Sequence, residues 1–335
     1  MVQRKEPCKE REGFSLRKLA SVQVIRDLTP IENADRIELA HIEGFQCVVP
    51  KGYHVGDKVI YIETDSICPK NETFAFLKGH SHIKLQKIRG VYSQGIALEY
   101  HGDAPVGTDM TEELSIVKYE PPEQPMDTVG AFPWYIPKTD EVRAQNIPEL
   151  LSKYKGVPCY ATEKLDGSSC TIYRSKGHIG VCTRKREVDN TSPMYRTAEE
   201  QGLLEFISNL DKDIAIQGEF VGPKQQGNHL HLPKHHIYVF SVYDIGKHGY
   251  FDQDTMDLFL GFHNVDTVPI VNEFALTDNI DELVRLATGN STFGNFPREG
   301  IVIRPIEPIE GLQGFPGNRF SFKVINPEYQ MKRGE

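Results

Sequence analysis

Hydrophobic and polar positions alternate in short runs through the first third of the chain. The runs SVQVIRDL, RIELAHIEG, FQCVVPKG, DKVIYIE and GIALEY follow one another between Leu16 and Val117, each bounded by turn residues. Several short strands at regular spacing predict an all-β barrel or sandwich. A segment of about 100 residues has the size of a five-stranded OB-type barrel, a fold that often binds nucleic acids.

The pattern changes after a proline-rich run. Residues 119–127 contain three prolines, which resist both helix and sheet, so we predict a linker there. This linker would separate an OB-type domain over residues 14–118 from a second domain over residues 128–335.

Helical and strand-like segments alternate in the second domain. EVRAQNIPELL and TAEEQGLLEFISNL have helical spacing, and in the latter Leu203, Ile207 and Leu210 share one face. The strand-like segments are SCTIYR, HIGVCTR, DIAIQGEFV, HIYVFSVYDI, GIVIRP and RFSFKVI. The pattern predicts an α+β domain with antiparallel sheets.

Composition and charge are those of an ordinary globular chain. Of its 335 residues, 39% are hydrophobic and 25% are charged, which excludes a disordered or fibrous protein. No apolar run is long enough to span a bilayer, and the charged N-terminus lacks the apolar core of a secretory signal. The six cysteines form no CxxC pair, so we expect a reducing, intracellular compartment. A net charge of −9 argues against bulk coating of nucleic acid, but leaves room for a nucleic-acid enzyme with local basic patches.

The sharpest local signal is Lys164-Leu165-Asp166-Gly167, in which a lysine enters a glycine turn beside an acid. A lysine acts as a nucleophile only after it loses a proton, and burial or a nearby cation can lower its pKa from about 10.4. An Asp-Gly pair is also a common hairpin turn, so a surface turn is the plain alternative.

Further segments place polar or aromatic residues where a buried strand would be apolar. Glu219 ends the strand DIAIQGEF, and Glu299 precedes a glycine and the strand IVIRP. Lys323 interrupts an apolar strand, which is costly unless an anion pairs with it. Residues 238–244 form an aromatic strand. Each signal is weak alone, because Glu219 could be structural and the aromatic strand could be ordinary core.

Together and in this order, the segments resemble the covalent nucleotidyltransferase superfamily, which comprises ATP-dependent DNA and RNA ligases and mRNA capping enzymes. The resemblance covers residues 138–325. The matching positions are Lys164 to Gly167 for the KxDG nucleophile motif, Thr183-Arg184 for the arginine motif, Gly218-Glu219 for the third motif, Phe240 to Asp244 for the aromatic strand, Glu299-Gly300 for the EG motif and Lys323 for the last motif.

The order of the domains narrows the resemblance. DNA ligases and capping enzymes usually carry an OB domain after the last motif, whereas only 12 residues follow Lys323 here. The KTDE-x-R-x-QN run over residues 138–146 is similar to an RNA ligase feature. The chain thus resembles ATP-dependent RNA ligases built from an N-terminal OB domain and a minimal α+β nucleotidyltransferase domain. That resemblance implies sealing of RNA 3′-OH and 5′-phosphate ends, typically at nicks in duplexes.

The resemblance implies a role for each motif residue. Lys164 would attack the α-phosphorus of ATP, the substrate, and Arg143 would orient the leaving pyrophosphate. The other residues expected to contact the nucleotide are Glu163, Arg184, Glu219, Glu299 and Lys323. Mg²⁺ or Mn²⁺ is expected on the oxygen ligands Asp166, Glu219 and Glu299.

Adenine stacking is expected on the aromatic strand. Neighbouring strand positions face opposite ways, so Phe240 and Tyr243 should point to opposite faces and only one of them can stack. We favour Tyr243. RNA is the expected partner, no membrane is involved, and the chain is expected to be a monomer.

One position departs from the family pattern. The last motif is commonly Lys-x-Lys, whereas this chain has Ser321-Phe322-Lys323. The phosphate contact of the first lysine is therefore open, and Arg143, Arg304 or Lys185 could replace it. A capping guanylyltransferase, a DNA ligase and an inactive RNA-binding protein are the alternative functions.

Two polar clusters have less specific interpretations. A group of histidines could suggest zinc, but no cysteine accompanies it, and a loop near substrate phosphates or a plain solvated loop fits better. These histidines are His229, His231, His235 and His236. Lys84, Lys87 and Arg89 in the OB-type domain could bind RNA or form an ordinary solvated strand. The run 184–186, Arg-Lys-Arg, flanks the nucleophile and has the better claim to RNA.

Overall fold

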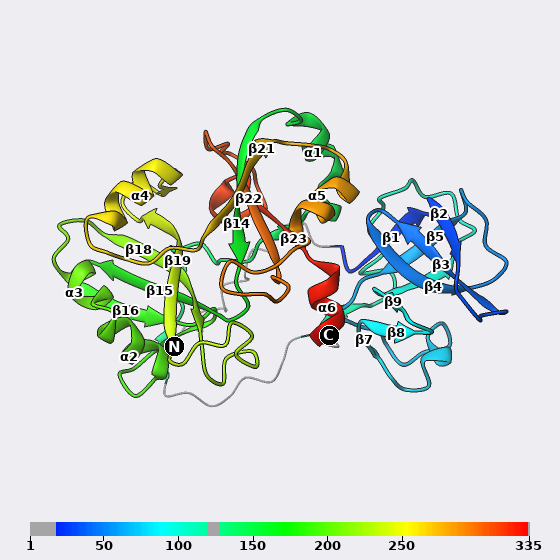
Figure 1. Cartoon of the computed structure of the whole chain (residues 1–335), viewed down its shortest axis with the longest axis horizontal. Helices are drawn as coiled ribbons and strands as arrows, with labels where there is room; N and C mark the ends of the chain where they lie inside the picture. The colour runs from blue at the N-terminus through cyan, green and yellow to red at the C-terminus, as the bar shows by residue number, and fades with distance from the viewer. Residues whose placement is uncertain (1–17, 120–127, 334–335) are drawn as a thin grey trace, which may run out of the picture.

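Short antiparallel sheets build the N-terminal domain of the computed structural model, which describes residues 18–119 and 128–333. The strands, sheet by sheet, are β1 (Ala20–Val24), β5 (Lys58–Ile62) and β10 (Ile96–Glu99); β2 (Asp27–Pro30), β3 (Ile37–Ile42) and β4 (Phe45–Pro50); β11 (Val117–Lys118), β6 (Ser66–Ile67) and β7 (His82–Ile83); and β8 (Gln86–Ile88) with β9 (Val91–Ser93). The 3-10 helix η1 (Ala75–Leu77) lies between β6 and β7 in the chain. Figure 1 shows this domain at one end of the molecule.

Strand β5 forms the centre of the N-terminal domain, because both of its faces are buried. Ile60 and Ile62 pack into one hydrophobic cluster with residues of β1, whereas Val59 and Tyr61 pack into a second cluster with residues of β3 and β4. Burial on both sides is expected where short sheets close around a strand as in a small barrel. The sheets are shorter and more divided than a single five-stranded barrel would be.

The predicted linker over residues 119–127 lies outside the described residues, apart from Tyr119. Residues 14–17 of the predicted first domain also lie outside them. The Tyr119 ring stacks on His82 with 3.9 Å between ring centroids, and its N–H donates to Asp65 O at 2.7 Å. Tyr119 therefore still packs on the N-terminal domain, while the exact domain boundaries remain predictions.

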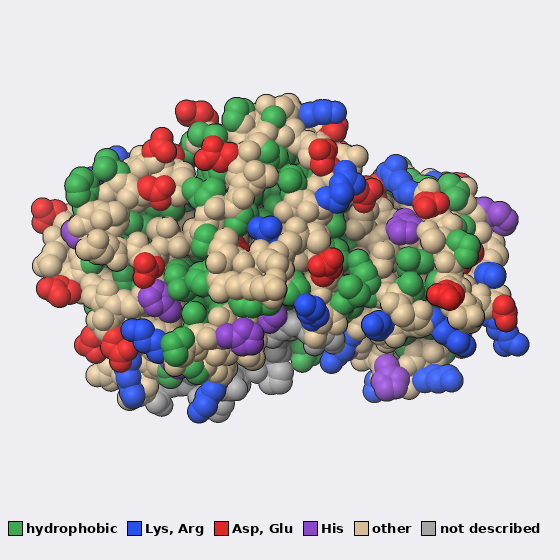
Figure 2. Space-filling model, viewed as in Figure 1, with side chains coloured by type: hydrophobic (Ala, Val, Ile, Leu, Met, Phe, Trp, Pro, Cys, Tyr) green, Lys and Arg blue, Asp and Glu red, His purple; other side chains and the backbone are tan. Residues whose placement is uncertain are grey.

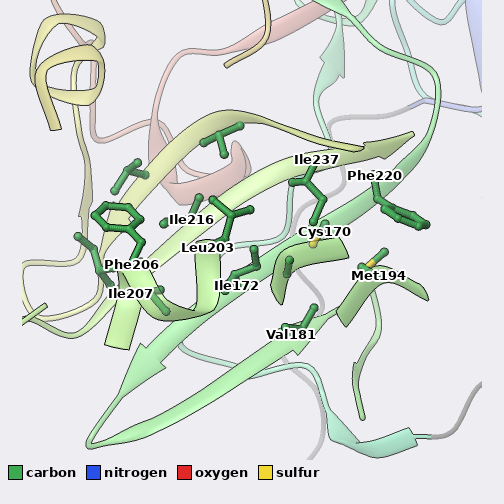
Figure 3. Close-up of a cluster of buried hydrophobic side chains, with 14 of the residues drawn as sticks. Cys170, Ile172, Val181, Met194, Leu203, Phe206, Ile207, Ile216, Phe220 and Ile237 are labelled. Atoms are coloured by element: carbon green, nitrogen blue, oxygen red, sulfur yellow. The ribbon is translucent and has the colours of Figure 1, made fainter. Parts of the chain in front are cut away.

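The larger sheet of the second domain is antiparallel throughout. In spatial order its strands are β12 (Thr128–Ala131), β17 (Arg186–Val188), β16 (His178–Cys182), β15 (Ser168–Ser175), β18 (Ile214–Val221), β19 (His236–Asp244) and β20 (Gly249–Tyr250). The helices α2 (Pro193–Glu200), α3 (Leu203–Ser208) and α4 (Gln253–Gly261) cover one face through a shared hydrophobic core. Figure 3 shows Met194 of α2 and Phe206 of α3 in one cluster with Cys170 and Ile172 of β15. On the opposite face, Tyr173, Ala215 and Tyr243 pack into a smaller cluster with Ile136.

The second sheet carries Arg143, Lys164 and Lys323. In spatial order its strands are β13 (Val142–Arg143), β23 (Phe322–Ile325), β22 (Gly300–Pro305), β14 (Pro158–Lys164) and β21 (Ile270–Ala275). The pair β13–β23 is parallel and the other pairs are antiparallel. Helices α1 (Pro148–Lys153) and α5 (Ile280–Ala287) cover this sheet, with Leu151 and Leu283 in its core. The 3-10 helices η2 (Ala144–Asn146) and η3 (Pro316–Asn318) complete the domain.

Both predicted helical segments are shorter in the structure than the spacing suggested. EVRAQNIPELL begins as β13 and η2, and becomes helical only from Pro148, whose fixed φ suits a first helical turn. The other segment divides at Gly202, which has φ +72° and separates α2 from α3. Leu210 lies beyond the end of α3, although it still packs on the same core.

Helix α6 (Pro327–Arg333) follows the last strand and lies between the two domains in Figure 1. Gln94 Nε2 of the N-terminal domain donates to Gln330 Oε1 at 3.2 Å. Across residues 18–119 and 128–333, helices long and apolar enough to cross a membrane are absent.

Candidate active site

One strand ladder positions the candidate nucleophile against an acid. Lys164, the last residue of β14, is paired with Gly300, the first residue of β22, so Glu299 lies immediately beside it. Lys164 Nζ donates to Glu299 Oε1 at 2.6 Å, and less than a quarter of either side chain is exposed. The KxDG and EG motifs, 135 residues apart in sequence, thus meet in a partly buried ion pair.

The motif glycines permit close approach of backbones. A Cβ at Gly300 would lie 2.2 Å from Val324 O, and a Cβ at Gly167 would lie 2.4 Å from Phe220 O. Both positions are closed to any side chain, because the clashing atoms belong to backbone. Gly167 therefore fixes the turn after Lys164, and Gly300 fixes the start of the strand after Glu299.

Glu219 completes an acidic pair around Lys164. It lies on β18, paired with Ser169 of β15. Burial raises the pKa of Glu219 to about 7; the charge of Lys164 opposes the rise, and the charge of Glu299 adds to it. A backbone hydrogen bond from Gly167 lowers it slightly. Glu219 is consequently a carboxyl group that exchanges its proton near neutral pH.

The environment holds Lys164 in its protonated form. Burial lowers the pKa of the ammonium, but the charges of Glu299 and Glu219 and the hydrogen bond to Glu299 outweigh burial, so the net pKa is raised. The positive charge of Arg143 opposes this rise. Deprotonation of Lys164 therefore requires that the negative charge around it be offset or moved.

The acidic pair fits a divalent cation. Glu299 Oε2 is buried and has no hydrogen-bond partner among the described residues, which leaves a hard oxygen donor available. The negative charge of Glu299 contributes to the raised pKa of Glu219, so the two carboxyl groups lie close enough to repel each other. A cation shared by the two carboxylates would remove this repulsion.

Asp166 contacts helix α6. Its Oδ2 accepts a hydrogen bond from Tyr329 Oη on α6. Within residues 18–119 and 128–333, no group of three or more His, Cys, Asp or Glu side chains is arranged to hold one metal ion. One oxygen of Asp166 thus faces α6, and a metal set of Asp166, Glu219 and Glu299 stays a prediction. Tyr329 is 1% exposed, and nothing in its sequence context marked it in advance.

Two basic residues lie in register beside the acidic pair. The parallel pairing of β13 with β23 places Arg143 next to Lys323, and Lys323 is paired with Val302 of β22. Arg143 acts electrostatically on Lys164, as its effect on the pKa of that lysine indicates. The KTDE-x-R run and the last motif are therefore neighbours in space, as the sequence interpretation requires.

Comparison with other proteins decides the family. The model of a family described as RNA ligase matches residues 157–325, and that of an OB-fold domain matches residues 19–100. The chain belongs to the RNA ligase family. Both the OB-type domain and the α+β nucleotidyltransferase domain predicted from the sequence are confirmed by these matches.

Solved RNA ligase structures resemble the whole molecule. The Naegleria gruberi RNA ligase with PPi is 32% identical with a TM-score of 0.81, over 94% of this chain and 98% of that chain. A lysine-to-alanine mutant of the Naegleria gruberi enzyme with ATP and Mn is 32% identical with a TM-score of 0.82, over 94% and 99% of the two chains. A lysine-to-methionine mutant with AMP and Mn gives the same values. Among curated protein sequences, none matches this chain.

Glu163 of this RNA ligase anchors a loop. Its carboxylate accepts hydrogen bonds from Ser291 Oγ at 2.5 Å, from Thr292 N–H at 2.8 Å and from Thr292 Oγ1 at 2.7 Å. The side chain is 2% exposed. Its contacts hold the segment that leads to Glu299, whereas sequence reasoning assigned Glu163 to the nucleotide and missed Ser291 and Thr292.

Arg184 lies at the more open edge of the site. It pairs with Asp140 at 3.0 Å, and about half of each side chain is exposed, at 42% and 48%. One residue earlier, Thr139 Oγ1 lies 2.7 Å from Ser169 Oγ at the start of β15. The KTDE run therefore links the arginine motif to the strand that follows the nucleophile.

A buried cation fills the place beside Ser321. Arg304 Nε donates to Ser321 Oγ at 3.1 Å, and Ser321 Oγ donates to Glu141 Oε1 at 2.8 Å. Arg304 also pairs with Glu141 at 3.2 Å and is 5% exposed. Of the three residues suggested to replace the missing lysine, Arg304 is thus the one that contacts Ser321, and its charge is paired with Glu141.

The prediction that Phe240 and Tyr243 face opposite ways is wrong. The pairing of β18 with β19 shifts register, so that Gln217 is opposite Ser241 whereas Gly218 is opposite Val239, which leaves Phe240 as the extra residue of a β-bulge. Val239 and the residue three positions later, Val242, therefore both pack into the helix-covered core.

Both aromatic residues lie away from that core. Phe240 belongs to a cluster with Leu165, the residue after the nucleophile, and is partly exposed. Tyr243 is 5% exposed in another cluster, edge-on to Tyr250 at 5.0 Å. Phe240 thus lies beside the residue that follows the nucleophile, whereas Tyr243 packs in a separate cluster.

The histidines take separate hydrogen-bond partners. His229 Nε2 lies 3.1 Å from Pro297 O, and His235 Nε2 lies 2.7 Å from Pro223 O. The ring of His229 also meets Tyr329 edge-on at 4.6 Å. The loop that carries these residues therefore packs against the segment before Glu299 and against α6.

Proposed function

We propose that this RNA ligase seals RNA 3′-OH and 5′-phosphate ends at nicks in duplexes, through a lysyl-AMP and then an RNA-adenylate. The observation that carries the proposal is the partly buried contact between Lys164 and Glu299 beside Glu219. Covalent nucleotidyl transfer needs a lysine whose proton can be removed in place, next to groups that manage phosphate charge.

ATP is the proposed substrate and Mg²⁺ or Mn²⁺ the proposed metal. The relatives solved with ATP and Mn support this assignment, as does the carboxylate pair with its unpartnered oxygen. Glu219 and Glu299 would hold the cation, which would supply charge neutralisation at the phosphates and favour the neutral amine of Lys164.

In the first step, the lone pair of Lys164 Nζ attacks the α-phosphorus of ATP. A phosphorus–nitrogen bond forms, the bond from the α-phosphorus to the bridging oxygen breaks, and pyrophosphate leaves. Glu299 Oε1, at 2.6 Å, is the acceptor in place for the proton that Nζ must lose. Arg143 and Lys323, which are neighbours in the β13–β23 register, face the phosphates as fixed positive charges.

In the second step, an oxygen of the RNA 5′-phosphate attacks the phosphorus of the lysyl-AMP. The phosphorus–nitrogen bond breaks, and Lys164 takes up a proton again. In the third step, the 3′-OH attacks the 5′-phosphorus, loses its proton and releases AMP. Arg184, at the open edge of the site, is placed to contact the RNA 5′-phosphate or the ribose. Phe240 is proposed to stack on adenine.

The basic residues of the OB-fold domain are the second proposed RNA surface. Residues 70–89 contain Lys70, Lys78, Lys84, Lys87 and Arg89 but a single acid, Glu72. Figure 2 shows basic side chains gathered over the part of this domain where β7 and β8 lie. A duplex that reaches Lys164 could extend across both domains.

Nick sealing tests the proposed function. The adenylylated enzyme would be isolated and given a nicked duplex with an RNA 3′-OH, a matched nick with a DNA 3′-OH, and the same strands unannealed. The proposal predicts fastest sealing of the RNA nick and a transient RNA-adenylate. Preference for the DNA 3′-OH would instead indicate a DNA ligase. Labelling by GTP in place of ATP would indicate a capping guanylyltransferase.

A further inference from the structure

Trp134 is the single tryptophan of the chain, and its side chain is 92% exposed. Tryptophan is strongly buried on average, so an almost fully exposed indole departs from its usual environment. The one ring contact recorded for it among the described residues is edge-on to Tyr135, at 5.7 Å between centroids, which leaves the indole faces uncovered.

The residues next to Trp134 are anchored to the domain. Ile136 is 3% exposed, and Phe132 and Tyr135 pack on the same hydrophobic cluster beside β15 and β18. Ile136 N–H donates to Pro133 O at 3.2 Å, which closes a turn around the indole. Trp134 is thus held outward by three anchored neighbours.

This turn is attached to the basic run at residues 184–186. Phe132 N–H donates to Lys185 O at 3.1 Å, and Ala131 is paired with Arg186 in the β12–β17 ladder. The chain around Trp134 therefore lies beside three consecutive cationic residues in a protein whose net charge is −9. A flat aromatic face beside cationic side chains suits a polyanion that carries flat bases.

The same segment leads to the active site. Pro137 O accepts from Gln217 Nε2 at 2.8 Å, and Thr139 Oγ1 lies 2.7 Å from Ser169 Oγ, two strand positions from Gly167 of the nucleophile turn. Arg184, which pairs with Asp140, directly precedes Lys185, whose carbonyl holds the turn of Trp134. A strand that contacts Arg184 would therefore lie near the segment that carries Trp134.

We propose that Trp134 is a base-stacking site for the RNA strand, outside the nucleotide site. An unpaired or terminal nucleobase next to the reacting end would stack on the indole, while the cations of residues 184–186 face its phosphates. This inference rests on the proposed RNA substrate. It concerns RNA binding and leaves the adenylylation chemistry of Lys164 unchanged.

The single tryptophan makes a direct test possible. The full-length wild-type protein, without ATP, would be titrated with a 5′-phosphorylated single-stranded RNA oligonucleotide while tryptophan emission is recorded. Stacking predicts quenching that saturates with the RNA. An oligonucleotide of equal length with abasic riboses should bind through its phosphates and leave the emission unchanged. Equal quenching by the abasic strand would overturn the proposal, since the signal would then report a domain movement.

Binding measured by anisotropy of labelled RNA gives an independent readout. Trp134→Ala should weaken RNA binding about tenfold, and Trp134→Phe should retain part of the affinity. The slope of log binding constant against log salt concentration should stay unchanged in Trp134→Ala. In Lys185→Ala the magnitude of this slope should fall by about one. Unchanged affinity in Trp134→Ala would contradict the proposal.

Labelling and sealing separate this inference from the proposed function. Trp134→Ala should form the lysyl-AMP at the wild-type rate and lose sealing only at low RNA concentration. A wild-type protein that seals RNA with no change in tryptophan emission would refute the stacking site alone. A wild-type protein that neither binds nor seals RNA would refute the function on which it rests.

Discussion

Lys164 and Glu299 face each other across one antiparallel ladder, with Lys164 Nζ 2.6 Å from Glu299 Oε1. The pairing stores the nucleophile as an ammonium, since the net effect of its surroundings is to raise its pKa. The same carboxylate accepts the hydrogen bond of the ammonium, so Glu299 both stabilises protonated Lys164 and is in place to take its proton. Reaction therefore depends on what neutralises Glu299 and Glu219.

Lys164→Ala is expected to abolish covalent labelling by α-³²P ATP, because the amine provides the attacking atom. The measurement is a denaturing gel after incubation with Mg²⁺ or Mn²⁺. Lys155→Ala is the matched control. Lys155 follows α1 in the chain, is exposed and pairs with Asp278. Full labelling of Lys164→Ala would show that another residue is the nucleophile.

The raised pKa of Glu219 predicts a pH dependence. Below about pH 7 Glu219 is mostly protonated, and its proton competes with a divalent cation. Adenylylation at limiting metal concentration should therefore rise with pH through about 7, and the rise should move to lower pH as the metal concentration increases. Glu219→Gln should lower the rate and remove this rise. A wild-type profile that is flat across pH 7 would contradict the assignment.

Stability without metal should show the opposite trend. The folded chain keeps the proton of Glu219 between its ordinary pKa of 4.5 and about 7, whereas the unfolded chain has released it. Since the folded state binds more protons in this window, the contribution of Glu219 to stability falls as the pH rises. Thermal unfolding of wild type and Glu219→Gln, in the presence of a chelator, measures the difference.

The order and register of the strands explain how much of this site was predictable. Lys164, Glu219 and Glu299 stand at strand ends or next to glycines, and these local features are visible in sequence. Phe240 was placed wrongly relative to Tyr243, because a β-bulge depends on how two strands pair and leaves no mark in the alternation of a single strand.

Long-range contacts were beyond sequence reasoning for the same reason. Glu163 looked like part of the nucleophile motif, but its partners Ser291 and Thr292 lie in a loop more than a hundred residues later. Tyr329 gave no signal, since one tyrosine in a short terminal helix resembles any surface residue until the fold buries it against Asp166.

Phe240→Ala is expected to weaken ATP binding about tenfold, because loss of a base–aromatic contact costs about 1–3 kcal/mol. Tyr243→Ala should instead lower the melting temperature, since that ring is buried against Tyr173 and Tyr250. Equilibrium binding of ATP and thermal unfolding, measured on both variants, separate the two roles. Weaker ATP binding in Tyr243→Ala alone would restore the assignment first made from the sequence.

Tyr329→Phe removes only the hydroxyl that donates to Asp166. A hydrogen bond to a charged group contributes about 1.5–3 kcal/mol, so the orientation of Asp166 should loosen and sealing should slow about tenfold. Tyr173→Phe is the matched control, because Tyr173 Oη donates to Glu187 Oε2 at 2.9 Å toward the other end of β15. Equal loss of sealing in both variants would indicate general destabilisation and no special role for Tyr329.

Ser321→Lys would restore the Lys-x-Lys pattern and is expected to impair the protein. Ser321 is fully buried, and its Oγ bridges Arg304 and Glu141. A lysine there would add a cation where Arg304 and Arg319 already repel each other, with Glu141 as the carboxylate paired with Arg304, and an uncompensated buried charge costs about 3–5 kcal/mol. Ser321→Ala, which removes the hydroxyl without adding charge, is the control and should cost about 1–3 kcal/mol. Thermal unfolding of the two variants measures the difference, and a Ser321→Lys protein as stable as wild type with faster adenylylation would show that Arg304 yields its place to a lysine.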